Sequence, residues 1–272
     1  MPSMRLCAHG VSYAYPDGTL AIEGVSLCVS SGKVICVLGP NGSGKSTLLL
    51  LMAGLIRPSS GRITLDGVEI DSLEYRKICG ILFQDPSDQL IAPTVEEDVA
   101  LGPEQLRLGK EEVRERVRSS LERLGLLGLE RKSPFRLSGG EAAKVALAGL
   151  MALDPEVYLL DEPSSSLDLR GVEVLKEVLR ELKGRGKIVV IATQDSDFAS
   201  EVADEVYIMN KGRLIAGGDL RILSELPLEE IGIKPPTALR ICRMLFPLIK
   251  DPLVDLDSLI EVLRRTLSSQ RD

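Results

Sequence analysis

One glycine-rich stretch constrains the fold of this chain more than any other feature. Residues 39–47 read Gly-Pro-Asn-Gly-Ser-Gly-Lys-Ser-Thr and match the pattern G-x-x-x-x-G-K-[ST] in full. The apolar, β-rich run Val34–Leu38 precedes the stretch, and the apolar run Leu48–Ile56, interpreted as a helix, follows it. A strand, a glycine-rich loop and a helix in this order are typical of an α/β fold whose loop curls around phosphate oxygens.

The residue types in this loop explain how it would hold a nucleotide. Glycines let successive backbone N–H groups converge on phosphate oxygens, and a helix that starts near Gly44 directs its positive end at the same charge. Lys45 adds a cation facing the β- and γ-phosphates, and the Ser46 hydroxyl can ligate Mg²⁺. A glycine-rich turn without a ligand is the alternative, which the complete match in this setting disfavours. We predict an ATP and Mg²⁺ site that includes Gly39, Pro40, Asn41, Gly42, Ser43, Gly44, Lys45, Ser46 and Thr47.

The wider pattern supports an α/β fold, because short apolar runs alternate with amphipathic stretches. The predicted strands are Met4–Ala8, Val34–Leu38, Arg62–Leu65, Ile78–Phe83, Val157–Leu160, Ile188–Ala192 and Val206–Met209. Between residues 92 and 152 the spacing becomes helical, and from about residue 219 prolines punctuate short helical patterns. We expect a domain over residues 1–218 with a helical subdomain at about 92–152, and a small helical C-terminal extension over 219–272.

Composition and charge narrow the classes of function. The net charge is −7, whereas a nucleic-acid-binding surface normally carries a basic excess. No apolar run approaches the roughly 18 residues needed to span a bilayer, and the first residues lack the pattern of a signal peptide. The five cysteines are scattered without a C-x-x-C pair, so we expect buried, reduced thiols and a cytoplasmic protein.

Two further segments indicate ATP hydrolysis. The apolar run Val157–Leu160 ends in Asp161 and Glu162, where a carboxylate can hold the Mg²⁺ shell and its neighbour can orient or deprotonate the attacking water. The segment Leu137–Glu141 places two glycines at the start of a helix and predicts a second anion-binding terminus. A single nucleotide cannot easily reach two such termini in one protomer, so the second one is expected to serve a nucleotide on a partner. A plain serine N-cap is the alternative.

The order of these motifs over residues 1–218 resembles that of the ATP-binding cassette (ABC) ATPases, a P-loop NTPase family. The resemblance implies a head-to-tail dimer in which each nucleotide lies between one subunit's phosphate loop and the signature motif of the other. It implies that Ser138, Gly139 and Gly140 contact the partner's nucleotide and that Asp168 reaches across the interface. It also implies that Gln84 links Mg²⁺ to the helical subdomain. Tyr15 would stack on adenine, with a solvated strand tyrosine as the alternative.

Two segments, Phe83–Leu90 and Ala92–Val99, resemble the energy-coupling-factor and cobalt/nickel importer ATPases more narrowly. That resemblance implies transport-coupled ATP hydrolysis at the cytoplasmic face of the cell membrane. Its implied partners are a second ABC ATPase, a transmembrane coupling protein and a membrane subunit that binds the substrate. A soluble ABC ATPase of repair or translation is a further alternative, but the coiled-coil insertion or tandem cassette usual in such chains is missing from this sequence.

One position departs from the family pattern. After Ile188–Ala192 the family usually has a switch histidine, whereas this chain reads Thr193-Gln194-Asp195 and its one histidine, His9, lies far from any motif. A glutamine amide can donate a neutral hydrogen bond to the γ-phosphate but cannot become cationic. Two interpretations follow. Gln194 acts as a substitute in a working site together with Glu162 and Lys45, or this chain is an impaired nucleotide-binding partner of an active subunit.

Overall fold

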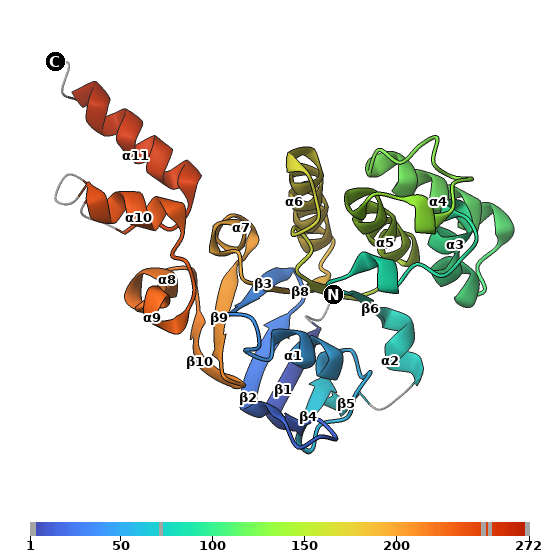
Figure 1. Ribbon diagram of the computed structural model, residues 1–272, viewed down its shortest axis with the longest axis horizontal. Helices are drawn as coiled ribbons and strands as arrows, with labels where there is room; N and C mark the ends of the chain where they lie inside the picture. The colour runs from blue at the N-terminus through green and yellow to red at the C-terminus, as the bar shows by residue number, and fades with distance from the viewer. Residues whose placement is uncertain (1–3, 71–72, 246–248, 250–251, 270–272) are drawn as a thin grey trace.

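The computed structural model describes residues 4–70, 73–245, 249 and 252–269, and within them it places two β-sheets and flanking helices (Figure 1). One sheet is antiparallel, with the order β2-β1-β4-β5, and comprises β1 (Arg5–Ala14), β2 (Leu20–Ser30), β4 (Ser60–Leu65) and β5 (Val68–Glu69). The other has the order β10-β9-β3-β8-β7-β6 and comprises β3 (Lys33–Leu38), β6 (Cys79–Leu82), β7 (Val157–Asp161), β8 (Ile188–Thr193), β9 (Glu205–Asn210) and β10 (Arg213–Gly218). Its strands pair in parallel except for the antiparallel pair β9 and β10.

The α/β prediction is confirmed, and every predicted strand overlaps an observed one. The prediction missed β2, β5 and β10. Strand β2 alternates buried and more exposed residues from Val25 to Val29, as expected for a sheet with one face on the core. The helix after the glycine-rich loop, α1, spans Lys45–Met52. It therefore begins and ends earlier than the apolar run Leu48–Ile56 suggested.

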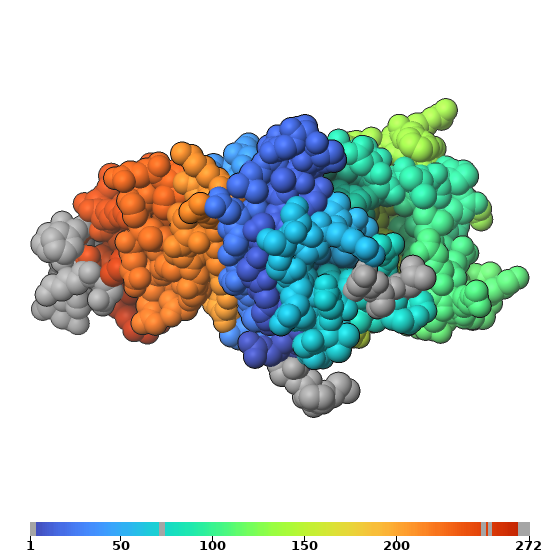
Figure 2. Space-filling view, turned by 90° about the horizontal axis from the view of Figure 1, so that it is seen from below, coloured from blue at the N-terminus to red at the C-terminus, as the bar shows by residue number. Residues whose placement is uncertain are grey.

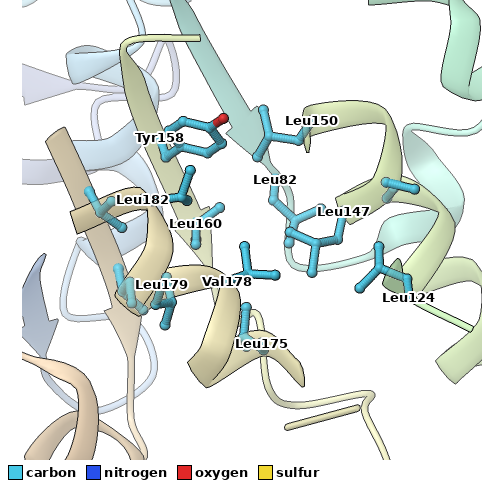
Figure 3. Close-up of a cluster of buried hydrophobic side chains, with 14 of the residues drawn as sticks. Leu82, Leu124, Leu147, Leu150, Tyr158, Leu160, Leu175, Val178, Leu179 and Leu182 are labelled. Carbon is cyan, nitrogen blue, oxygen red and sulfur yellow. The ribbon is translucent and has the colours of Figure 1, made fainter. Parts of the chain in front are cut away.

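The larger sheet has a hydrophobic core on each face. In β3, Val34, Cys36 and Leu38 face one cluster, while Ile35 and Val37 face the other. The first cluster is covered by α5 (Gly139–Leu153) and α6 (Leu169–Gly184), whose leucines pack with side chains of β6 and β7 in Figure 3. The second cluster encloses α1 between the two sheets. Burial on both faces explains why the central strands β3, β7 and β8 are continuous apolar runs.

Most of the remaining helices lie at the two ends of the molecule (Figures 1 and 2). On one side of the sheets, α5 packs against α3 (Val95–Gln105) and α4 (Lys110–Arg123), whose apolar residues Val113, Val117 and Leu121 are buried. In chain order, the short helices α2 (Leu73–Ile78) and η1 (Pro86–Asp88) come between β4 and α3, and η2 (Pro134–Arg136) precedes α5. Next to β9 lies α7 (Ser196–Val202), and beyond β10 follow α8 (Ile222–Glu225), α9 (Leu228–Ile231), α10 (Thr237–Met244) and α11 (Leu256–Ser269). Within the described residues, every helix is too short or too polar to cross a bilayer.

The structure overturns one expectation about the cysteines. Cys7 of β1 and Cys28 of β2 lie directly opposite each other and form a disulfide, whereas both had been expected as reduced thiols. Cys36, Cys79 and Cys242 are free, as expected. The pairing joins residues 21 positions apart, so no local spacing pattern announces it. With Cys7 and Cys28 paired, the cysteines no longer indicate a cytoplasmic location as a set of five reduced thiols would. His9 contacts Thr64 through Nε2 and Oγ1 at 3.0 Å.

Candidate functional site

The glycine-rich loop joins the end of β3 to the start of α1, and two of its positions require glycine. Gly44, which precedes α1, has a φ of 101°, and a Cβ atom there would lie 2.5 Å from the carbonyl oxygen of Ala21. A Cβ atom at Gly39 would lie 2.4 Å from the carbonyl oxygen of Met209. Strands β2 and β9 thus press on the loop backbone and exclude any side chain, which explains both glycines.

Helix α1 begins at Lys45 with the features of an anion-binding terminus. Its first turn contains no acidic residue, and its N-cap residue, Gly44, has no side chain to cap the N-terminal N–H groups. The buried Lys45 ammonium donates hydrogen bonds to the carbonyl oxygens of Gly39 at 2.8 Å and Pro40 at 3.2 Å. Burial lowers the pKa of Lys45, and the carboxylates of Glu162 and Asp161 oppose that change. The loop therefore holds a cation at its centre.

Two buried side-chain oxygens beside this cation have no hydrogen-bond partner among the described residues. They are Ser43 Oγ in the loop and Asp161 Oδ1 at the end of β7. Burial raises the pKa of Asp161, whereas a hydrogen bond with Ser46 and the charge of Lys45 lower it. Buried polar atoms are normally paired, so an unpaired carboxylate oxygen next to a serine hydroxyl indicates room for a ligand such as a divalent cation.

Glu162 is held in one orientation by two donors that follow β8. Its Oε2 accepts from Thr193 Oγ1 at 2.9 Å, and its Oε1 accepts from the backbone N–H of Gln194 at 3.0 Å. The residue itself has a φ of 45°, in the left-handed region. Burial raises the pKa of Glu162, and the Thr193 hydroxyl is the strongest of the groups that lower it. A fixed carboxylate of raised pKa is suited to act as a general base.

Thr193 is a site residue that no sequence motif indicated. Its hydroxyl is fully buried, donates to Glu162 and accepts from the backbone N–H of Asp195 at 3.0 Å. Its neighbour Gln194 contacts the Glu162 carboxylate through the backbone N–H, and Gln194 itself is exposed. Because β7 and β8 are neighbours in the sheet, the residues at the end of β8 lie beside Glu162. This pairing is the signal by which the sequence could have indicated both donors.

Tyr15 follows β1 and lies against the phosphate loop. Its phenol oxygen is 2.9 Å from Thr47 Oγ1, and its ring meets that of Tyr13 edge to face, with centroids 5.1 Å apart. The residue remains 39% exposed, so part of the ring is open to a ligand. An aromatic ring beside a phosphate loop is suited to stacking on a planar base.

An open cleft of about 900 Å³ brings further predicted residues together. Its lining includes Ser46 and Asp161 from the phosphate site, Gln84 from the segment after β6, and Gly139 from the start of α5. The segment that carries Gln84 is fixed by Gln89, whose side chain accepts from the N–H of Phe83 at 2.8 Å and donates to Ile81 O at 2.9 Å. Gln89 is thus a supporting residue that the sequence analysis did not single out.

The start of α5 is a capped terminus. Ser138 is its N-cap, and its side chain accepts from the N–H of Glu141 while the Glu141 carboxylate accepts from the N–H of Ser138 at 2.7 Å. Lys132 pairs with the same carboxylate at 3.3 Å. The plain capping role considered as an alternative for Ser138 is therefore present. It leaves Gly139 open, because a Cβ atom there would meet no atom within 4 Å.

The fold and this site define the class: the chain is a P-loop ATPase, with an anion-binding loop, a central lysine and an acidic strand end. The sequence matches the family described as ABC transporter over residues 22–165. It is 45% identical over 216 residues to the energy-coupling factor transporter ATP-binding protein EcfA of Methanococcus maripaludis, covering 78% of each chain.

Solved structures agree with the sequence comparison. The fold is similar to cbiO1 of Clostridium perfringens, part of the ABC transporter complex cbiONQ, with a TM-score of 0.72 and 35% identity over 89% of this chain and 95% of that one. It is also similar to a dimeric ATP-binding cassette in a post-hydrolysis state bound to ADP and Pi, with a TM-score of 0.73 and 28% identity over 79% of this chain and 99% of that one. The chain belongs to the ABC transporter family and is an ABC ATPase.

Proposed function

We propose that this chain is the ATP-hydrolysing motor subunit of an energy-coupling-factor type importer for a vitamin or for cobalt or nickel. The observation that carries the proposal is the arrangement around Glu162, a buried carboxylate fixed by Thr193 and Gln194 and next to Lys45. This arrangement supplies a base beside a phosphate-binding cation, as ATP hydrolysis requires. The importer type is supported by the 45% identity to a relative named EcfA and by the similarity to cbiO1.

The residues present fit a Mg²⁺–ATP complex. The Ser46 hydroxyl and the carboxylate of Asp161 would hold Mg²⁺, with Gln84 on the same cleft, because Asp161 Oδ1 is buried without a partner among the described residues. Bound Mg²⁺ would neutralise charge on the β- and γ-phosphates. Lys45 and the N–H groups of the loop bind those phosphates, and Tyr15 stacks on the base. Glu162 then accepts the proton of the attacking water.

The working unit is a head-to-tail dimer with a second ABC ATPase, as the dimeric cassettes suggest. Ser138, Gly139 and Gly140 face the partner's nucleotide, and Asp168 contacts the partner across the interface. Residues 1–218 form the ATP-binding domain, with a helical subdomain at about 92–152, and 219–272 form the extension. The dimer docks on a transmembrane coupling protein and a membrane substrate-binding subunit at the cytoplasmic face, without a nucleic-acid partner.

Affinity purification from the native host tests this proposal. Affinity-tagged wild-type chain is isolated from membranes solubilised in mild detergent, and the co-purified proteins are identified by mass spectrometry. We expect a second ABC ATPase and at least one protein with several transmembrane segments, in a complex that releases phosphate from ATP. Tag-only membranes provide the control. A complex that is active but contains no membrane protein would overturn the transport function and would favour a non-transport ABC ATPase.

A second candidate follows from position 194. Gln194 is exposed and donates to Glu162 through its backbone N–H, whereas a switch histidine would offer a side chain that can carry positive charge. In this candidate the chain is a catalytically impaired partner, and its segment Ser138–Gly140 completes the site of an active subunit.

The substitution Gln194→His separates the two candidates. If the glutamine limits turnover, the ATPase rate of the dimer rises by at most about a hundredfold, while ATP affinity hardly changes because the new contact acts mainly in the transition state. Steady-state phosphate release at saturating ATP measures the rate, with Glu162→Gln as the blank. An unchanged rate with intact binding means that position 194 does not limit turnover.

A further inference from the structure

Lys144 connects two segments that the proposed dimer directs at the partner's nucleotide. It lies on the second turn of α5, behind the Ser138 cap, and its ammonium is 3.2 Å from Oδ1 of Asp168. Asp168 is the N-cap of α6, and the same Oδ1 accepts from the N–H of Gly171 at 2.8 Å. The Lys144 side chain is 21% exposed, whereas that of Asp168 is 67% exposed.

The two segments are also in close contact along their backbones. A Cβ atom at Gly140 would lie 3.1 Å from the carbonyl oxygen of Ser166. A Cβ atom at Gly171 would lie 3.0 Å from Cε of Lys144. The start of α5 therefore packs directly on the loop that leads from Glu162 to Asp168, and the stem of Lys144 fills the remaining space against α6.

The contacts of Asp168 have different consequences. The N–H of Gly171 belongs to the first turn of α6, so this hydrogen bond fixes Asp168 only to the helix that it caps. The ammonium of Lys144 comes from α5, and it fixes the same carboxylate to the helix that carries Ser138 and Gly140. Both donors lower the pKa of Asp168, the Gly171 N–H more strongly, so the side chain is an anion able to pair with Lys144.

We propose that Lys144 is a positioning residue for hydrolysis at the partner's site. It holds the Ser138–Gly140 segment and the Ser166–Asp168 loop as one unit, so that both meet the partner's nucleotide in register. This inference rests on the head-to-tail dimer of the proposed function. Its catalytic importance follows from geometry, since misplacing a group that contacts the reacting phosphate by about 1 Å can cost as much as a hundredfold in rate.

Kinetics of charge-removing variants test the proposal in the assembled complex. Lys144→Met keeps the aliphatic stem, and Asp168→Asn keeps an oxygen that can cap α6, so each removes the ion pair with little other change. We expect each variant to lower kcat by roughly 3- to 30-fold with unchanged KM, and the double variant to fall no further. Lys144→Arg should restore most of the rate. Lys176→Met, which breaks the pairs of this α6 lysine with Glu173 of α6 and Glu201 of α7, is the matched control and should leave kcat unchanged.

Mixed dimers, purified through two different tags, locate the effect. One subunit carries Glu162→Gln, so that turnover arises only at the site of the other subunit. Lys144→Met should lower turnover when it is added to the Glu162→Gln subunit, which supplies the signature segment to the active site. The same change in the hydrolysing subunit should have little effect.

Three results would overturn the inference. These are an unchanged kcat in Lys144→Met, additive losses in the double variant, or an equal loss with the substitution in either subunit of the mixed dimer. They are distinct from failure of the proposed function. That failure would appear as a wild-type complex that does not hydrolyse ATP, or one whose hydrolysis survives Glu162→Gln in both subunits.

Discussion

Removal of the Thr193 hydroxyl should change the pH dependence of ATP hydrolysis. In Thr193→Val the buried Glu162 carboxylate loses the donor that lies 2.9 Å from Oε2. A hydrogen bond to a charged group contributes about 1.5–3 kcal/mol. This bond favours the ionised form, so its loss raises the pKa of Glu162 further. Because the base must be ionised to accept a proton, the acidic limb of the rate profile should move to higher pH by about one to two pH units.

The assay is steady-state phosphate release at saturating ATP across the acidic limb, for wild type, Thr193→Val and Thr193→Ser. The serine variant keeps the hydroxyl and should retain the wild-type limb. The valine also removes an acceptor for the N–H of Asp195, which costs stability but does not titrate. An acidic limb that stays in place in a folded Thr193→Val protein would refute the assignment of Glu162 as the base held by Thr193.

Stability provides a second readout with a defined sign. Burial raises the folded-state pKa of Glu162 above its ordinary value. The contribution of Glu162 to the free energy of unfolding is therefore fully present below the unfolded-state pKa and is lost as pH rises through the folded-state pKa. Thr193→Val increases that loss. Urea unfolding should show a larger deficit for Thr193→Val at neutral pH than at a pH where Glu162 is protonated in both states.

Three further predictions test the site and the fold. Lys45→Ala should weaken ATP binding and abolish turnover, because it removes the cation that faces the phosphates; isothermal titration with unchanged affinity would contradict that role. Glu162→Gln should bind ATP without hydrolysing it and accumulate as a dimer in size-exclusion chromatography with ATP and Mg²⁺; a monomer under these conditions would count against the sandwich dimer. Cys28→Ser should lower the free energy of unfolding by about 3 kcal/mol under oxidising conditions, as expected for a disulfide closing a loop of this length. Wild type in reductant should show the same loss in urea unfolding. Equal stability of oxidised wild type, reduced wild type and Cys28→Ser would show that the disulfide does not form.

The parts of the site that depend on neighbouring residues could be predicted from the sequence. The loop from Gly39 to Thr47 requires a strand before it and a helix after it, and both are visible as apolar runs. Asp161 follows a buried run, so its position at the carboxyl end of a strand was also predictable. Both inferences use only local sequence patterns and the rule that parallel strands are buried on both faces, which makes them apolar throughout.

The parts that depend on distant residues could not be predicted in the same way. The Glu162–Thr193 hydrogen bond joins positions 31 residues apart, and the ion pair of Lys144 with Asp168 requires the start of α6 to lie against α5. Strand β2 was missed for a different reason. Its buried residues alternate with polar ones and with Gly24, so it lacks the continuous apolar run by which the other strands were identified.

The geometry at position 194 limits what the missing histidine can mean. The contact between residue 194 and Glu162 uses the backbone N–H of Gln194, which every residue except proline supplies. The orientation of the base is therefore independent of the side chain, and Thr193 provides the second donor in either case. Any catalytic deficit caused by Gln194 must come from its own contact with the γ-phosphate. Because an amide can still offer one hydrogen bond there, we expect slow turnover rather than an inactive site.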